Sequence, residues 1–139
     1  MENWLATNPL PGMILWIMLY ISDYYMTIYT ARGYREIEHF KFEGSFELTP
    51  QYQKDIDALK PVSKLHVTLL VLYSLLIVLI WWFTKFLLVF PWTYLLYLGM
   101  FLLLEVAVHL RHLRNVSLIR EIRRNCRFSN MKFLCSISP

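Results

Sequence analysis

The stretch from Leu65 to Phe83 contains no Asp, Glu, Lys or Arg and consists mainly of aliphatic and aromatic residues. A helix needs about 20 apolar residues to cross the hydrocarbon core of a bilayer, which is close to the length of this stretch. Over the whole chain 57% of residues are hydrophobic and 17% are charged, whereas soluble domains carry about 25% charged residues. The sequence therefore predicts an integral membrane protein, and this stretch is its clearest span.

Two further stretches predict spans of similar length. One covers residues 10–30 and is weakened by Asp23 and several tyrosines. The other covers residues 91–110, where Pro91 suits the first helical turn because its missing N–H is not needed there. We therefore expect an all-α integral membrane protein with transmembrane helices at 10–30, 65–83 and 91–110, forming a single membrane domain over residues 1–139.

The distribution of Lys and Arg predicts the orientation of these spans. The N-terminal tail has no Lys or Arg, and the link between the second and third spans has only Lys85. The loop 31–64 contains six, and the tail 111–139 contains seven. Cytoplasmic connections are enriched in Lys and Arg, so we expect the loop and the tail in the cytoplasm and the N-terminus outside. Three crossings also place the loop and the tail on one side.

The cytoplasmic loop is expected to contain a short hairpin and a short helix. Residues 39–43 and 46–49 alternate between polar and apolar around Gly44-Ser45, which is typical of a β-hairpin. Thr49-Pro50 resembles the cap and first turn of a helix that continues to Leu59. An isolated hairpin is marginally stable in water, so we expect this insert to pack against the membrane, the tail or a partner.

The third helix is expected to continue beyond Arg111 as a basic amphipathic C-terminal extension. Its apolar stripe consists of Leu110, Leu113, Val116 or Ser117, Leu118 or Ile119, and Ile122. Such a helix either lies on the inner leaflet or packs on the hairpin. Five arginines are candidates for contact with anionic lipid headgroups or a phosphate, although anchoring of the cytoplasmic side explains them more simply. They are Arg111, Arg114, Arg120, Arg123 and Arg124.

Ionisable residues inside the predicted spans are the main candidates for a functional site. A carboxylate at membrane depth costs about 2.5–3.5 kcal/mol on insertion scales, so it is rarely placed there without a partner or a task. Asp23 and Glu105 each lie about thirteen residues into their spans, which predicts one depth for both. Helical spacing adds further polar residues to the same faces. We expect one cluster containing Asp23, Thr27, Glu105, His109, His112 and His66.

Three interpretations of this cluster stay open. Carboxylate and imidazole ligands on neighbouring helices suit zinc, iron or manganese, but the ExxxHxxH spacing is neither the HExxH signature nor a full di-iron set. Acid–histidine pairs also suit proton or ion transfer. The simplest interpretation, which we favour, is a structural hydrogen-bond network. The sequence therefore identifies no bound metal and no cofactor.

No motif in the sequence indicates a particular enzyme class. There is no Gly-rich phosphate loop, GxSxG motif or HExxH motif, so whether the protein is an enzyme stays open. The net charge of +4 is explained by the Lys and Arg residues that mark the cytoplasmic side. Nucleic acid is not expected as a partner, because the sequence has no stretch in which basic residues alternate with aromatic residues that could stack on bases.

The partners expected instead are the lipid bilayer and other membrane subunits. Three helices cannot surround a buried acid on every side, so we expect a homo-oligomer or a larger membrane complex. The favoured function is a non-enzymatic accessory or assembly subunit. The alternatives are a homo-oligomeric ion or proton channel lined by the first and third spans, and an intramembrane enzyme that uses the acid–histidine cluster.

Overall fold

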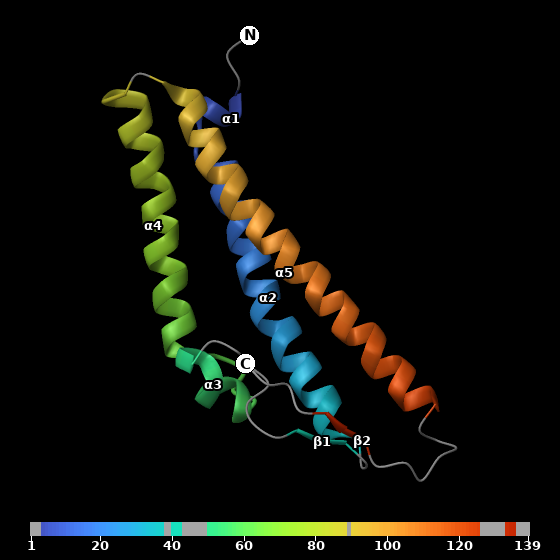
Figure 1. Cartoon of the computed structure of the whole chain (residues 1–139). Helices are drawn as coiled ribbons and strands as arrows, with labels where there is room; N and C mark the ends of the chain where they lie inside the picture. The colour runs from blue at the N-terminus through green and yellow to red at the C-terminus, as the bar shows by residue number, and fades with distance from the viewer. Residues whose placement is uncertain (1–3, 38–39, 43–49, 89, 126–132, 136–139) are drawn as a thin grey trace.

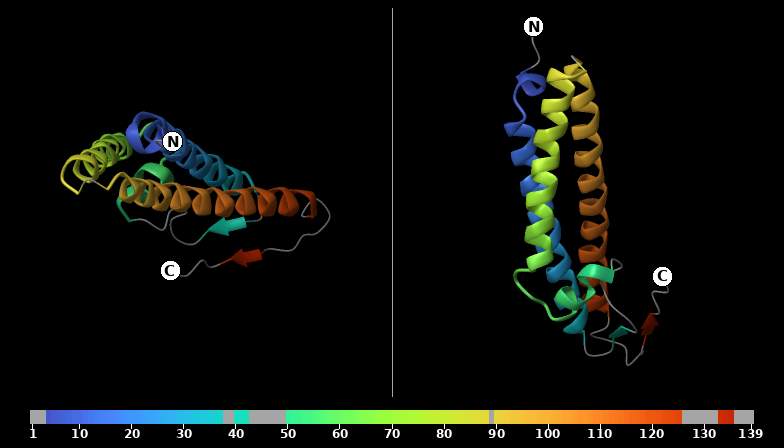
Figure 2. Two further views of the ribbon diagram at one scale, coloured as in Figure 1. Left: turned by 90° about the horizontal axis from the view of Figure 1, so that it is seen from above. Right: turned by 90° about the vertical axis from the view of Figure 1, so that its left-hand side faces the viewer.

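The computed structural model of the chain describes residues 4–37, 40–42, 50–88, 90–125 and 133–135. The fold is predominantly helical, and three long helices run side by side along the molecule (Figures 1 and 2). They are α2 (Leu10–Arg35), α4 (Lys64–Phe86) and α5 (Pro91–Asn125). The short helices α1 (Trp4–Thr7) and α3 (Pro50–Asp57) lie at opposite ends of the molecule.

Among the described residues, two helices are long and apolar enough to cross a membrane. They are α4, with 23 residues, and the 33-residue segment Trp92–Arg124 of α5. The helix α2 is not among them, because Asp23, Pro11 and several tyrosines lower its hydropathy. The structure thus supports a helical membrane protein with two candidate spans, and the third span stays a prediction.

The helix α4 begins at the predicted cap. The hydroxyl oxygen of Ser63 accepts the backbone N–H of His66 at 3.3 Å, which satisfies one of the free amide groups of the first turn. Farther along, Thr68 and Ser74 donate their hydroxyls to carbonyls of their own helix at 2.9 and 2.7 Å. Because these hydroxyls are satisfied locally, they do not need water on an apolar helix surface.

The helices α2 and α5 pack against each other in parallel. A Cβ atom added to Gly12 would lie 2.3 Å from Leu98 Cδ2, and one added to Gly33 would lie 3.1 Å from Ile119 Cδ1. Small residues allow two helix backbones to approach in this way. Each α5 residue that bonds to α2 lies 85 to 90 sequence positions after its partner. The register between the two helices is therefore nearly constant.

Three clusters of buried residues hold the helices together. The first joins the three long helices, the second joins α3 to α2, and the third lies where the ends of α2 and α5 meet. Their members are Trp16, Ile77, Tyr94 and Leu98; Tyr24, Ile28, Ala31 and Ile56; and Tyr34, Ile37 and Ile119.

The extension of α5 differs from the predicted amphipathic arrangement. It is helical to Asn125, and Ile119 of the predicted apolar stripe is buried. Leu110 and Leu113 of the same stripe are exposed, however, and His112, which was not part of it, is buried. The reason is that α2 continues to Arg35, beyond the predicted end of its span, and covers that side of α5. The extension therefore packs on α2, which the sequence did not predict.

The loop contains β1 (Phe40–Phe42), which pairs in parallel with β2 (Phe133–Cys135) from the C-terminal tail. This pairing was not predicted, and the expected turn at Gly44-Ser45 with its second strand lies outside the described residues. The helix α3 lies within the stretch where a helix was expected and ends in a Schellman motif, with Leu59 at a φ of 49°. There Lys60 N–H donates to the Asp55 carbonyl at 2.9 Å.

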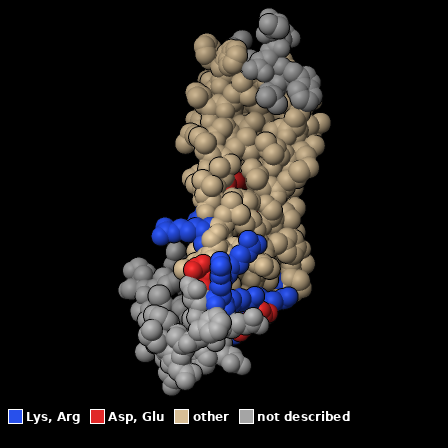
Figure 3. All heavy atoms as spheres, turned by 90° about the vertical axis from the view of Figure 1, so that its right-hand side faces the viewer, with Lys and Arg blue, Asp and Glu red and all other residues tan. Residues whose placement is uncertain are grey.

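Lys and Arg side chains gather at one end of the molecule on the face drawn in Figure 3. This end carries α3, the start of α4 and the final turns of α2 and α5 (Figure 1). Most of the remaining part of that face is uncharged. The polar groups described next lie near the boundary between these two regions.

Candidate functional site: the Asp23–His112 cluster and its cavity

Asp23 on α2 pairs with His112 on α5. The distance from Asp23 Oδ1 to His112 Nε2 is 2.7 Å, and the two side chains are 28% and 2% exposed. An ionised carboxylate only accepts hydrogen bonds, so Nε2 carries the hydrogen. Thr27 Oγ1 lies 3.2 Å from the same nitrogen and donates its own hydrogen to the backbone carbonyl of Asp23 at 3.0 Å. One imidazole N–H is thus shared between a carboxylate and a hydroxyl.

This arrangement does not activate Thr27 as a nucleophile. In a nucleophilic triad, the hydroxyl and the acid bind opposite nitrogens of the imidazole, so that one nitrogen can take the hydroxyl proton. Here both groups bind Nε2 of His112. Its Nδ1 is buried and has no hydrogen-bond partner among the described residues. The enzyme hypothesis therefore gains no nucleophile–base pair from these three side chains.

His109 makes a second connection between α5 and α2. Its Nδ1 donates to the backbone carbonyl of Glu105 at 2.7 Å, and its Nε2 lies 2.6 Å from Ser22 Oγ. In the neutral ring Nε2 accepts from Ser22, whereas in the doubly protonated ring it donates to Ser22. In the second state the Ser22 hydroxyl is available to donate to the Leu19 carbonyl at 2.9 Å.

Glu105 does not pair with Asp23, although the sequence predicted that they face each other. Bonded residues of α5 lie 85 to 90 positions after their α2 partners, whereas Asp23 and Glu105 are 82 positions apart (105 − 23). The difference of about five residues corresponds to about 7 Å along a helix. Glu105 Oε2 is buried without a partner among the described residues, but Asp23 still acts on Glu105 electrostatically.

His66 joins the region through ring stacking. Its imidazole lies between the rings of Tyr20 and Tyr24, with centroid distances of 4.3 and 4.4 Å and interplanar angles of 7° and 29°. The residue is 8% exposed, and its Nε2 has no hydrogen-bond partner among the described residues. His66 is therefore near the Asp23–His112 pair but is not bonded to it.

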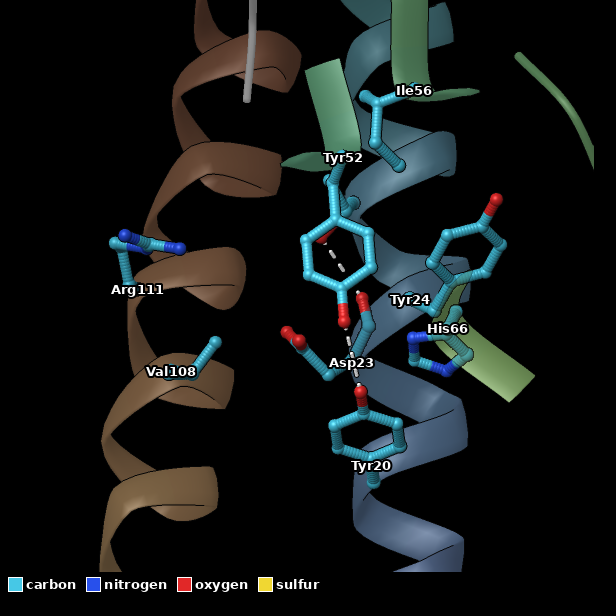
Figure 4. A pocket seen from close by; sticks show the side chains of 9 residues that line it. Tyr20, Asp23, Tyr24, Tyr52, Ile56, His66, Val108 and Arg111 are labelled. Carbon is cyan, nitrogen blue, oxygen red and sulfur yellow. Dashed lines mark hydrogen bonds between the residues drawn. The ribbon is translucent and has the colours of Figure 1, made fainter. Parts of the chain in front are cut away.

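A cavity of about 170 Å³ connects these residues (Figure 4). The helix α3 and the residues that follow it close one side of the cavity. Tyr52 OH of α3 lies 3.1 Å from Tyr20 OH, and Tyr24 OH donates to the carbonyl of Lys60, just after α3, at 3.0 Å. Four helices contribute to its lining, which consists of Tyr20, Asp23, Tyr24, Thr27, Tyr52, Ile56, His66, Val108 and Arg111.

The sequence placed Tyr20 on the helix face of Asp23 and Thr27, but it did not connect Tyr24 or Tyr52 with the predicted site. The spacing of three residues between Tyr20 and Asp23 was the signal for this shared face. Tyr52 and Ile56 belong to α3, and no sequence pattern connects that helix with Asp23. The cavity therefore depends on tertiary packing that the sequence pattern does not reveal.

The five predicted arginines have different surroundings. Arg123 Nη2 donates to Glu36 Oε2 at 2.6 Å and to the Gly33 carbonyl at 3.3 Å, so it connects α5 with α2. Arg111 lies at the cavity. In the part of the chain that the structure describes, no hydrogen bond or ion pair is made by the side chains of Arg111, Arg114, Arg120 or Arg124.

The predicted site residues do not form one bonded cluster. Asp23 bonds to His112, His109 bonds to Ser22, and Asp23, Thr27 and His66 line the cavity. Within the described ranges, no group of three or more His, Cys, Asp or Glu side chains could hold a metal ion. No family model, no curated protein and no solved structure matches this chain. Its function is therefore inferred from its own geometry.

Proposed function

We propose that this chain is a non-enzymatic integral membrane component that serves as an accessory or assembly subunit. The observation that carries this proposal is that polar side chains of α2 and α5 bond one another within a single chain. Asp23 and Thr27 meet His112, and Ser22 meets His109. In a bilayer, such bonds stabilise a helix pair while the outer surface stays apolar.

The proposal includes α2 as a third span. The helix has 26 residues and lies beside the two candidate spans. Its outward side chains include Ile14, Leu15 and Met18, which are exposed, while its acid is turned toward α5 and paired. The charged end then lies in the cytoplasm and the N-terminus outside, because Lys and Arg concentrate on the cytoplasmic side of membrane proteins.

The same geometry supports a subunit more than a channel. A pore lined by the first and third spans needs Asp23, Thr27 and Tyr20 to face an axis shared between protomers. Thr27 is buried against α5, and Tyr20 bonds to Tyr52 within the chain. Asp23 is paired with His112 within one chain, so an oligomer is not needed to provide its partner.

The helix α4 supports contact with a partner. Of its 23 residues, only His66, Ile77 and Thr84 are buried. Apolar side chains such as Leu75 and Leu79 point outward. In a bilayer, lipid chains or a second transmembrane helix can cover this surface, and packing of a partner helix depends on close van der Waals fit.

Native gel electrophoresis of mildly solubilised membranes tests the proposal. We expect the protein in one larger assembly, which Leu75→Trp on α4 disrupts and which the matched variant Leu96→Trp on exposed α5 leaves intact. Purified protein in liposomes should carry no Asp23-dependent proton or ion flux. A monomer in its own membrane would contradict the subunit proposal, and a flux abolished by Asp23→Asn would favour the channel.

A further inference from the structure

The cavity presents hydrogen-bond acceptors that the protein itself does not use. Asp23 Oδ1 accepts from His112, whereas Asp23 Oδ2 makes no bond among the described residues, and Asp23 lines the cavity. His66 is 8% exposed, lines the same cavity and has an unpartnered Nε2, which accepts a hydrogen bond in the tautomer that carries the proton on Nδ1. Figure 4 shows its nitrogen-bearing edge toward the side of Asp23 and Tyr52. An unpaired buried polar atom is costly, so a hydrogen-bonding ligand is stabilised there.

A third acceptor lies on the cavity wall. The hydroxyl oxygens of Tyr20 and Tyr52 are 3.1 Å apart, and both side chains line the cavity. A carboxylate, two phenol hydroxyls and an imidazole therefore line one cavity. A primary ammonium group carries three donors and no acceptor, and it is attracted to aromatic rings. Hard metal cations such as calcium and magnesium prefer oxygen ligands alone, so this mixed set fits an ammonium better.

Arg111 adds a cationic group at the same cavity. It lines the cavity from α5, the helix toward which the carboxylate of Asp23 points (Figure 4). It is exposed and makes no ion pair among the described residues. A guanidinium group binds phosphate oxygens through two parallel hydrogen bonds. A ligand that carries an ammonium close to a phosphate would therefore satisfy both sides of the cavity.

Size and position restrict this ligand further. The cavity of about 170 Å³ has room for five or six waters at about 30 Å³ each, which suits a two-carbon amine. It is lined by α3 and by the start of α4, which lie at one end of the molecule (Figure 1). Lys and Arg side chains gather at this end (Figure 3). In the proposed membrane orientation this is the headgroup level of the inner leaflet, where phospholipids supply the ammonium and the phosphate together.

We infer that the cavity binds the headgroup of a phospholipid with a primary ammonium, such as phosphatidylethanolamine. The ammonium bonds to Asp23 Oδ2, His66 Nε2 and the Tyr20–Tyr52 hydroxyl pair, and the phosphate pairs with Arg111. The inference rests on the proposed function only for the position of the cavity at the membrane surface. The lipid would then act as a structural ligand that ties α3, α4 and α5 to α2.

Nanodiscs that contain the full chain test this inference. Phosphatidylethanolamine and phosphatidylcholine differ in the three methyl groups that replace the N–H donors, so they form a matched ligand pair. We expect native mass spectrometry to find phosphatidylethanolamine retained at roughly tenfold over its bulk fraction, as loss of one charge-assisted hydrogen bond predicts for the methylated lipid. The unfolding temperature should also be higher in discs with phosphatidylethanolamine.

Variants separate the site from general bilayer effects. Asp23→Asn and Arg111→Gln should each abolish the difference in unfolding temperature between the two lipids. Arg114→Gln, which removes an exposed arginine outside the cavity, should preserve it. Because each variant is compared with itself in two lipids, a loss of stability common to both lipids does not affect the result.

Two further ligands distinguish the source of the headgroup. Phosphatidylglycerol offers the phosphate without the amine, and dissolved phosphoethanolamine offers both groups without a lipid. Equal retention of phosphatidylglycerol, or an unchanged lipid difference in Asp23→Asn, would overturn the inference. A full stabilising effect of phosphoethanolamine with none from phosphatidylethanolamine would overturn the lipid source. These results are independent of the native gel, so failure of the subunit proposal is recognised separately.

Discussion

Asp23 Oδ1 and His112 Nε2 are 2.7 Å apart and connect two parallel helices at residues that lie 89 positions apart in the chain. The pair is mostly enclosed, because His112 is 2% exposed and Asp23 is 28% exposed. Two glycines that allow close helix contact, Gly12 and Gly33, lie on either side of it along α2. This relationship fixes both the register of α2 on α5 and the place of the cavity.

Replacement of Asp23 by Leu should destabilise the protein by about 2–4 kcal/mol, because His112 then stays buried without its partner. Asp23→Asn should be milder, since the amide oxygen can still accept from Nε2. In a double-mutant cycle with His112→Leu, the double variant should lose less than the sum of the single variants. Reversible unfolding in detergent measures these differences, and additive losses would show that the two side chains are not coupled.

Gly33→Ala should leave the protein about 1 kcal/mol less stable than Gly99→Ala does, because the new methyl group at Gly33 overpacks the contact with Ile119. The nearest atom is Ile119 Cδ1 at 3.1 Å, and Ile119→Val removes it. Combining Gly33→Ala with Ile119→Val should therefore recover part of the loss. Gly99→Ala is the matched control, since its Cβ meets nothing within 4 Å among the described atoms, and it should be neutral or stabilising. The same unfolding assay distinguishes the two glycines.

Acid should release α3 from its docked position. The Lys60 ammonium and the Ser63 hydroxyl donate to Asp55 and hold the pKa of its carboxyl below the ordinary value of 3.8. A carboxyl with a lowered pKa in the folded state stabilises the fold above its ordinary pKa, and this stabilisation is lost as pH falls through the lowered value. Hydrogen exchange of the α3 amides between pH 6 and pH 3, corrected for intrinsic rates, measures the release.

The variant Asp55→Asn provides the control for this effect. At neutral pH it should show the faster α3 exchange that the wild type reaches only in acid, and acid should change it less. Equal pH dependence in the variant and the wild type would show that another group controls the docking of α3.

Cysteine labelling should place α1 and α3 on opposite sides of the membrane. In a background without Cys126 and Cys135, an impermeant thiol reagent should label Asn8→Cys in intact cells. It should label Gln51→Cys only after the membrane is permeabilised. Labelling of Gln51→Cys in intact cells would reverse the proposed orientation, and labelling of both positions would remove α2 as a span.

The sequence predicted the parts of this fold that depend on local pattern. The uncharged stretch at 65–83 and the Ser63 cap correspond to α4, and Pro91 begins α5, because hydropathy and capping are encoded within a few neighbouring residues. The polar residues of the cluster were also visible, since ionisable side chains stand out in apolar segments.

The pairing between distant segments could not be predicted in the same way. Equal distances from the helix starts put Asp23 opposite Glu105. Gly12 lies against Leu98 and Gly33 against Ile119, each 86 positions later (98 − 12 and 119 − 33), so α5 is displaced along α2 by more than one turn from that prediction. Helix periodicity says which face a residue occupies, not how far a neighbouring helix is displaced. The same limit applies to the strand pair of Phe40 and Phe133, and to Tyr52, which reaches the cavity from α3.

The wide separation of Asp23 and His112 has a consequence for biosynthesis. A ribosome adds about 5–20 residues per second, so roughly 4 to 18 seconds pass between synthesis of the acid and synthesis of the imidazole 89 positions later. In the proposed topology, α2 enters the membrane during this interval with a carboxylate whose partner His112 has not yet been made. In that topology the insertion machinery or the headgroup layer must hold α2 until α5 is made. A chain truncated before His112 would leave Asp23 without this partner.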